Sequence, residues 1–574
     1  MALTKAHSRM IEGAAVNVVD FGAVGDGVTD DTAAIQAAID SLPSGGNILF
    51  SFGTYLISDY LSLYSNQTID LNGSTVKQKD ASNIGNFGLF HCSSVNDVVI
   101  KNGSINGNGA NQTTYPWSGI KATSSNRISV ENMYIYDCVG DNVSDGQIAG
   151  IWLFESSYCK INNCYIKNSN NNMLLHRASY CTIENIIFED NTRSEALSVY
   201  KEGGDIPTLH NTITNCTFKN CRQGLGILGG KYTTVSNCSF DNSSNHAILV
   251  RNGPTSISNC QIKQGASAAD VAISIGQEDP DDDATYEFPI EISNVSVDLN
   301  GRDYDGFRIA LSSPSKTTLV NCKVFNSTGS GITNADGFNI QASTNVKLIG
   351  CYAEGLDIGF EVGGLRSKDL SFIDCVAVNN RRWGLLFDAS SITFANVIGG
   401  TYKNNSQASA GAYTGILVNS TNNYNVTIKD VSAYDDQDTP TQGITGISPS
   451  SKSGNPINSS SAPTEGFYRI GDQAWRRTPT AGNKPGFVVI NRVDTEVRVA
   501  WSSGTTLEVD STSGILANDV IGLQMDNGTY HFTTVASITD GDTLEMTSAP
   551  SSSSAAINNN VITYRWRDMA ALSP

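Results

Sequence analysis

The sequence predicts an all-β protein, a parallel β-helix built from short repeating coils. Two observations predict it. A hexapeptide with an apolar-x-polar-Cys-x-apolar pattern recurs along the chain, and a segment that begins with Gly and alternates apolar with other residues precedes many of its copies. One such strand-turn-strand unit cannot bury its inner face alone, so successive units are expected to stack into a continuous core.

The Cys-containing segments keep one fixed phase. Seven of them fit, with Gly at the polar place of the sixth and Ala ending the last two: INNCYI (161–166), ITNCTF (213–218), VSNCSF (235–240), ISNCQI (257–262), LVNCKV (319–324), LIGCYA (348–353) and FIDCVA (372–377). Parallel coils would stack these Cys about 4.8 Å apart inside the protein. None of the twelve Cys has the C-x-x-C spacing of a zinc site, so buried free thiols are expected. A β-sandwich would also alternate, but it would not keep this phase.

The second strand of each coil shows period-two alternation, which predicts one face inward and one outward. Its copies are GIWLFES (150–156), GFRIALSS (306–313), GFNIQAS (337–343), GFEVGG (359–364), GLLFDAS (384–390) and GILVNS (415–420).

The two ends of the chain differ from the coils. Residues 16–40 run from a strand through a Gly-rich turn into a helix, for which Thr29 or Asp30 is the expected N-cap. Such a helix can cover the open end of a β-helix, where strand edges are unpaired. The predicted domains are an N-terminal junction (1–15), the β-helix with its capping helix (16–435), a Ser/Pro/Gly-rich linker (436–465) and a C-terminal β-rich module (466–574).

Composition excludes some partners. Lys and Arg total 37 against 56 Asp and Glu, a formal net charge of −19, which argues against nucleic acid and anionic membrane surfaces. No apolar run is long enough to span a bilayer, and the start MALTKAHSRMIEG has no signal-like apolar region, so a soluble protein without membrane insertion is expected. The acidic run DPDDD (279–283), in the loop at 276–287, has the oxygen ligands that suit Ca²⁺, but it lacks the Gly and terminal Glu of an EF-hand loop, so a solvated loop, no metal and no cofactor are predicted.

Residues 16–40, followed by GGNILFSFGTYLIS (45–58), resemble the opening of pectate-lyase-like β-helices in bacteriophage tailspikes and capsule depolymerases. The segment SRMIEGAA (8–15) is similar to the junction where such tailspikes leave their virion-binding part. The resemblance implies a right-handed β-helix, a homotrimer, attachment to a virion tail protein through the N-terminus, and action at the bacterial surface. It implies binding, and usually cleavage, of a capsular or O-antigen polysaccharide. The C-terminal module is similar to those that trimerise such proteins or bind sugar.

Aligning the second strands predicts an acidic patch on the outward face. Asp305 and Asp336 stand directly before a strand Gly, and Glu361 takes the first outward place within its strand. Arg308 and Asn339 take that same outward place in their coils and are predicted to bind substrate. Neighbouring coils would separate two acids by about 5 Å, and coils two apart by about 9–10 Å. These distances bracket the spacings of retaining and inverting glycosidases.

The segment NADGF (334–338) also resembles the Asn-Thr-Asp-Gly motif of polygalacturonases, which implies that Asp336 is the matching acid. Ala335 replaces the Thr, however, and the family's Asp-Asp pair and Gly-His-Gly are absent, with only Asp357 in the next coil. The alternative is structural, because Asp before Gly is a common turn residue.

A second outward patch combines aromatic and basic side chains: Trp152, Phe154, His176, Tyr200 and Arg251. Flat rings with Arg suit a sugar groove, and Trp152, His176, Tyr200 and Arg251 are predicted to bind substrate. In a lyase, His176 or Tyr200 could be the base, with Arg251 or Lys201 neutralising a uronate. The alternative is that the aromatic rings simply pack beneath a loop or a neighbouring subunit.

Three functions therefore stay open. The first is a trimeric tailspike that hydrolyses a bacterial polysaccharide through Asp305, Asp336 and Glu361. The second is a lyase on the same fold that uses the His/Tyr patch, and the third is a glycan-binding adhesin without catalysis.

Overall fold

The chain forms the predicted β-helix. The computed structural model describes residues 15–82, 87–112, 118–140, 148–191, 194–201, 208–265, 270–276, 289–310, 316–329, 332–364, 367–388, 394–409, 412–419, 426–434, 444–445, 457–458, 473–475, 486–526, 529–550 and 554–568. The chain divides into two compact units, residues 1–308 and 309–574, and the division falls within β32 (Phe307–Ala310). No helix in the described ranges combines the length and apolarity needed to cross a membrane.

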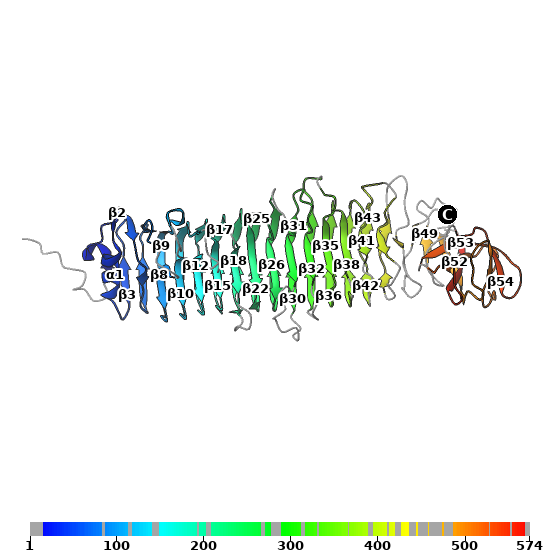
Figure 1. The fold of residues 1–574 in the computed structure, drawn as a ribbon, viewed down its shortest axis with the longest axis horizontal. Coiled ribbons are helices and arrows are strands. Elements are labelled where there is room, and N and C mark those ends of the chain that lie inside the picture. Colours follow the sequence, from blue (N-terminus) through cyan, green and yellow to red (C-terminus); the bar gives the residue numbers. More distant parts are fainter. Residues whose placement is uncertain are drawn as a thin grey trace, which may run out of the picture. The chain divides into compact units, whose positions relative to one another are not determined.

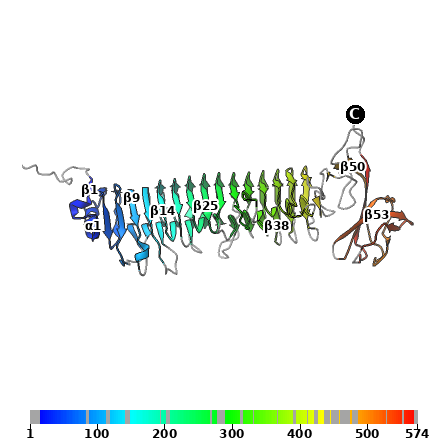
Figure 2. The ribbon, with the colours of Figure 1, turned by 90° about the horizontal axis from the view of Figure 1, so that it is seen from above.

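Residues 1–308 carry two parallel sheets, whose strands lie side by side in successive coils (Figures 1 and 2). The first begins at β1 (Val16–Asn17) and reaches β31 (Ser296–Asp298). The second consists of β5 (Leu61–Ser62), β8 (Gly88–Ser93), β10 (Ser118–Thr123), β12 (Ala149–Phe154), β15 (Asn171–His176), β18 (Glu195–Tyr200), β22 (Gln223–Leu228), β26 (Ile248–Asn252) and β29 (Ile273–Gly276).

Like residues stack inside the coils. Phe188, Phe218 and Phe240 form a continuous aromatic stack, with ring centroids 4.9 Å and 4.4 Å apart. All twelve Cys are free and buried, as predicted. The Cys238 thiol, for example, donates to the Ser236 carbonyl at 3.3 Å. These stacks bury the inner face that a single coil would leave exposed.

The helix α1 (Thr32–Asp40) stands at the blue end of the strand stack in Figure 1 and buries Ile35, Ala38 and Ile39. The predicted N-cap was wrong: Asp31 holds that position, not Thr29 or Asp30. Asp30 instead accepts hydrogen bonds from the Thr32 backbone N–H at 3.2 Å and its hydroxyl at 2.6 Å. The Asp31 carboxylate accepts from the backbone N–H groups of Val24 and Gly25, which fixes the Gly-rich turn.

The polar residue before each repeat Cys has a structural reason that the sequence did not reveal. Asn163, Asn215, Asn237 and Asn259 adopt left-handed backbone conformations, with φ between 52° and 55°. Asn tolerates that region better than most residues, and Gly tolerates it without cost, so the Gly of the sixth segment fits the same turn: Gly350 has φ 61°.

Residues 309–574 continue the two-sheet pattern. Their first sheet runs from β33 (Thr317–Val320) to β46 (Ser432–Tyr434), and their second contains β35 (Asp336–Gln341), β38 (Ile358–Gly363), β41 (Leu385–Phe387), β44 (Ile416–Val418) and β47 (Ile444–Thr445). The predicted register holds, because Asn339 pairs with Glu361, and Glu361 with Leu386. Two short strands, β47 and β48 (Ile457–Asn458), lie within the segment predicted as a linker.

The C-terminal module is an eight-stranded sheet with antiparallel pairing and its own core. Its strands are β48, β49 (Gln473–Trp475), β50 (Gly486–Glu496), β51 (Thr506–Glu508), β52 (Val520–Gln524), β53 (Tyr530–Ile538), β54 (Thr543–Met546) and β55 (Asn560–Asp568). Trp501 is buried in this core and donates to the Gly504 carbonyl at 3.2 Å. Trp566 packs against Val489, Val520 and Tyr564.

Candidate functional site

Two carboxylates meet on the outward face of the second sheet in residues 309–574. The side-chain amide Nδ2 of Asn339 donates to Asp336 Oδ2 at 3.2 Å and to Glu361 Oε2 at 3.1 Å. The two oxygens are therefore no further apart than the sum of these distances, about 6.3 Å. Gln341 in turn donates to Asn339 Oδ1 at 2.9 Å, which fixes the orientation of the amide.

The strand geometry explains why these residues converge. Asp336 and Asn339 stand three positions apart on β35 and are joined by their side-chain hydrogen bond, and Glu361 is the Cα partner of Asn339 on β38. Gly337 is required where β35 begins, because a Cβ there would lie 2.5 Å from the Gly359 carbonyl oxygen. Asp336 and Asn339 are buried at 3% and 6% exposure, whereas Glu361 is half-buried, so the pair opens to solvent on the Glu361 side.

A cationic group borders the pair. Asp357, which is fully buried, accepts hydrogen bonds from Arg382 through Nε and Nη2 and from Arg381 Nη1 at 3.2 Å. The Asp357 carboxylate raises the pKa of Arg382, and the charge of Asp336 contributes to that rise. Asp336 therefore lies within the field of Arg382. Sequence reasoning missed both arginines, although RRW directly before the strand GLLF was a visible signal.

Asp305 and Arg308 belong to residues 1–308. The Asp305 side chain is 8% exposed and pairs with Arg308 Nη2 at 3.5 Å, while Arg308 itself is exposed. Their predicted roles in catalysis and binding stay predictions. The acidic loop predicted at 276–287 lies, apart from Gly276, outside the described residues. Within the described ranges no cluster of His, Cys, Asp and Glu could hold a metal ion.

The aromatic patch forms on the second sheet of residues 1–308. Phe154, His176 and Tyr200 are successive Cα partners on β12, β15 and β18. The His176 ring lies 4.9 Å from the Phe154 ring and 5.1 Å from the Tyr200 ring. Trp152 and His176 are each only 2% exposed, and Trp152 packs with Ala149 and Leu174.

This burial matters for the predicted binding roles. Tyr200 is half-buried and Arg251 stands on β26, with β22 between it and β18. The structure therefore brings Trp152, His176 and Tyr200 into one packed cluster. Their assignment to substrate binding, with Arg251, stays a prediction.

A buried amine lies beside that cluster. Lys121, on β10, is 7% exposed and holds its Nζ 3.7 Å from the centroid of the Trp152 ring. Burial lowers the pKa of Lys121 to about 8. Burial, with the charge of Lys121, lowers the pKa of its Cα partner His91 to about 4. The rings of Trp152 and His91 and the amine of Lys121 all face outward from the sheet. Sequence periodicity does not reveal that these outward groups are buried.

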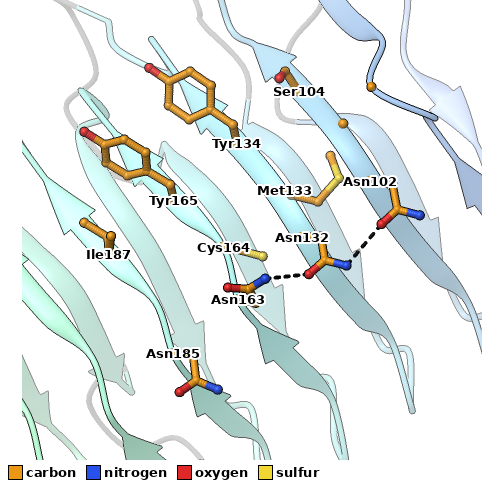
Figure 3. Close-up of a pocket in the computed structure, with 12 residues that line it drawn as sticks. Asn102, Ser104, Asn132, Met133, Tyr134, Asn163, Cys164, Tyr165, Asn185 and Ile187 are labelled. Atoms are coloured by element: carbon orange, nitrogen blue, oxygen red, sulfur yellow. Dashed lines mark hydrogen bonds between the residues drawn. The ribbon is translucent and has the colours of Figure 1, made fainter. Parts of the chain in front are cut away.

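A groove of about 430 Å³ follows the outer face of the first sheet in residues 1–308 (Figure 3). Tyr134 and Tyr165 stand on one side, with ring centroids 5.1 Å apart, and Asn102, Asn132 and Asn163 stand on the other. Asn132 donates to Asn102 at 3.1 Å, and Asn163 donates to Asn132 at 2.7 Å. The lining carries no Asp or Glu, so this groove lacks the carboxylate pair that glycoside hydrolysis uses.

Comparison with known proteins matches parts of the chain. Residues 15–249 match the family model "Rhamnogalacturonase A/epimerase, pectate lyase-like". A stretch of 64 residues is 47% identical to the plasmin and fibronectin-binding protein A of Streptococcus pneumoniae, covering 11% of this chain and 9% of that protein. A stretch of 44 residues is 59% identical to the mannuronan C5-epimerase AlgE5 of Azotobacter vinelandii, covering 7% of this chain and 4% of that enzyme.

Among solved structures, the tailspike protein of Escherichia coli bacteriophage HK620, in complex with a pentasaccharide, aligns with a TM-score of 0.48 at 12% identity. The alignment covers 96% of this chain and 93% of the tailspike. By contrast, the sequence matches to the Streptococcus and Azotobacter proteins span less than a tenth of the length of either protein. Residues 15–249, which match this pectate-lyase-like family model, coincide with parallel β-helix coils in the part that the structure describes.

Proposed function

We propose that this chain binds a bacterial surface polysaccharide, capsule or O-antigen, and depolymerises it by glycosidic hydrolysis with Asp336 and Glu361 as the paired carboxylates. The observation that carries the proposal is the pair itself, two acids on neighbouring strands bridged by the amide of Asn339. The match of residues 15–249 to a family of polysaccharide-acting β-helices supports the substrate class.

The spacing favours hydrolysis with retention at the anomeric carbon. Retaining glycosidases hold their carboxyl groups about 5–5.5 Å apart, whereas inverting enzymes need about 6.5–9.5 Å to admit a water. The upper limit of about 6.3 Å between Asp336 Oδ2 and Glu361 Oε2 falls below the inverting range.

In the proposed reaction one carboxylate attacks the anomeric carbon while the other, as the acid, protonates the departing glycosidic oxygen. Water then cleaves the glycosyl ester, the second group takes its proton, and both groups return to their starting forms. Glu361 is half-buried and can exchange its proton with water, whereas Asp336 is buried. We therefore assign the nucleophile to Asp336 and the acid-base role to the more exposed Glu361.

The other predicted residues take supporting roles in this proposal. Asn339 orients the pair, and Asp305 remains the candidate third acid, with Arg308 as its cationic neighbour. Trp152, His176, Tyr200 and Arg251 remain candidates for contact with the polysaccharide, for which Tyr200 offers the more accessible ring of the packed cluster.

Product analysis tests the proposal. Capsule-typed bacterial lawns identify a polysaccharide that the chain clears, and that polymer is then digested in solution. Hydrolysis predicts new reducing ends without ultraviolet-absorbing unsaturated ends. Unsaturated ends would favour the lyase alternative instead, and binding without shortening would favour an adhesin.

The assembly is part of the same proposal. By its resemblance to tailspikes, the chain would act as a homotrimer on a phage tail and attach to a virion tail protein through its N-terminus. Multi-angle light scattering of the purified chain tests the trimer, and a monomeric mass would contradict it.

A further inference from the structure

We propose that Arg382, Trp383 and Tyr413 form a subsite for an acidic sugar residue beside the carboxylate pair. This inference rests on the proposed function and adds a substrate class to it, a polysaccharide that carries carboxylate groups. The proposed subsite is called the arginine ledge below.

The position of the ledge follows from the register of the coils. The backbone N–H of Gly359 donates to the Trp383 carbonyl at 3.0 Å, so Trp383 pairs with the coil that carries Ile358. Ile358 is in turn the Cα partner of Asp336. Trp383 thus stands two coils from Asp336 and one coil from Glu361, about 5–10 Å along the coil direction. The charge of Asp336 contributes to the raised pKa of Arg382, which agrees with a ledge that borders the pair.

A buried carboxylate and stacked rings hold the arginine ledge rigid. Asp357 is fully buried and binds the Nε edge of Arg382, so the guanidinium plane is fixed rather than free to follow solvent. Arg382 lies 5.1 Å over the Trp383 ring, and Tyr413 meets that ring edge-on at 4.9 Å. A site whose groups are already oriented loses less entropy on binding.

A strained turn carries Tyr413. Ser406 is fully buried and has φ 82°, a conformation that side-chain-bearing residues rarely adopt. Its hydroxyl accepts from the Tyr413 backbone N–H at 3.0 Å, and its own N–H donates to the Arg382 carbonyl at 2.8 Å. Backbone strain of this kind concentrates where a function fixes the conformation. In this protein the strained residue, Ser406, links Arg382 to Tyr413 through these two hydrogen bonds.

The chemistry of the arginine ledge points to a carboxylate as the ligand. Arg381 and Arg382 share the single carboxylate of Asp357, so one positive charge is left to serve both Asp336 and a ligand. The Arg382 side chain keeps 33% exposure, which leaves part of the guanidinium accessible. A guanidinium matches the planar geometry of a carboxylate, and an adjacent aromatic ring packs against the apolar face of a sugar.

An array of purified capsular polysaccharides, each printed beside its carboxyl-reduced form, tests the inference. The array is probed with the Glu361→Gln chain, so that binding is read separately from cleavage. We expect signal on acidic polymers that falls at least 10-fold on their reduced forms and about 10- to 100-fold with an added Arg382→Gln, the range of a charge-assisted hydrogen bond. Arg127→Gln is the matched control, because Arg127 forms an exposed two-point ion pair with Asp97.

Equal binding to the reduced polymers, binding that Arg382→Gln leaves unchanged, or no binding to any acidic polymer would each overturn the ledge. The comparison of natural with reduced polymers needs no change at Arg382, so the test stands even if Arg382→Gln fails to fold. Failure of the proposed hydrolysis has a different signature: the wild-type chain would bind polymers without shortening them, or Glu361→Gln would still shorten a susceptible polymer.

Discussion

Asp336 and Glu361 accept hydrogen bonds from the same side-chain nitrogen, that of Asn339, although they stand 25 positions apart in the chain. Stacking of successive coils creates this relationship, because it places outward residues of neighbouring coils one strand spacing apart. Two acids in such a position can divide the work of a glycosidase between them.

Asp336→Asn and Glu361→Gln are each expected to lower kcat about 100- to 10,000-fold, because each removes a group that forms or protonates a bond in the transition state. The release of reducing ends from a susceptible polysaccharide measures this loss. Asp388→Asn is the control, since Asp388 is an exposed acid next to β41 on the same face and should leave the rate within about twofold. Full activity of Asp336→Asn would exclude Asp336 as the nucleophile.

Asn339→Asp places a third carboxylate between the existing two. Like charges disfavour ionisation, so the acidic limb of the pH-activity profile is expected to move to higher pH. The profile of kcat/KM against pH measures the shift, and Asn419→Asp serves as a control on the same face. An unchanged profile with unchanged rate would show that Asn339 does not contact the catalytic acids in solution.

Lys121 links stability to pH. Its pKa is lowered to about 8 in the folded chain, below the usual value of about 10.4, so between these values the unfolded state binds more protons. The contribution of Lys121 to the free energy of unfolding should therefore rise as the pH increases from about 8 to about 10. The difference in thermal stability between the wild type and Lys121→Met, measured across this pH range, should show this rise.

Lys160 provides the contrast for that measurement. It is exposed and pairs with Glu184 at 2.9 Å, which raises its pKa. Its contribution is present at lower pH and is lost as the pH passes its folded pKa, so Lys160→Met should not reproduce the rise. A flat difference for Lys121→Met would contradict the burial of its amine.

The left-handed turn at Asn237 gives a test of the fold. Ala pays a steric penalty of about 1–2 kcal/mol in this conformation, whereas Gly pays none. Asn237→Ala is therefore expected to lower the free energy of unfolding by about 1 kcal/mol, with Asn237→Gly closer to the wild type. Urea denaturation of the two variants measures the difference. Greater destabilisation by Gly than by Ala would contradict the φ of 55°.

The sequence was sufficient to predict the coils, the free thiols and the register that brings Asn339 to Glu361, because strand alternation and a fixed Cys phase determine which residues face outward. It was not sufficient for Arg382, whose position depends on a buried partner, Asp357, in the preceding coil. Nor could alternation reveal that Trp152 and His176 are buried, because an outward residue is exposed only where no other side chain covers it.

The most direct test of the central claim is the stereochemistry of cleavage, read by proton nuclear magnetic resonance on fresh products of a susceptible polysaccharide. Paired action of Asp336 and Glu361 predicts reducing ends that first appear in the anomeric form of the original linkage and mutarotate afterwards. First appearance of the opposite anomer, or of unsaturated ends in place of reducing ends, would contradict it.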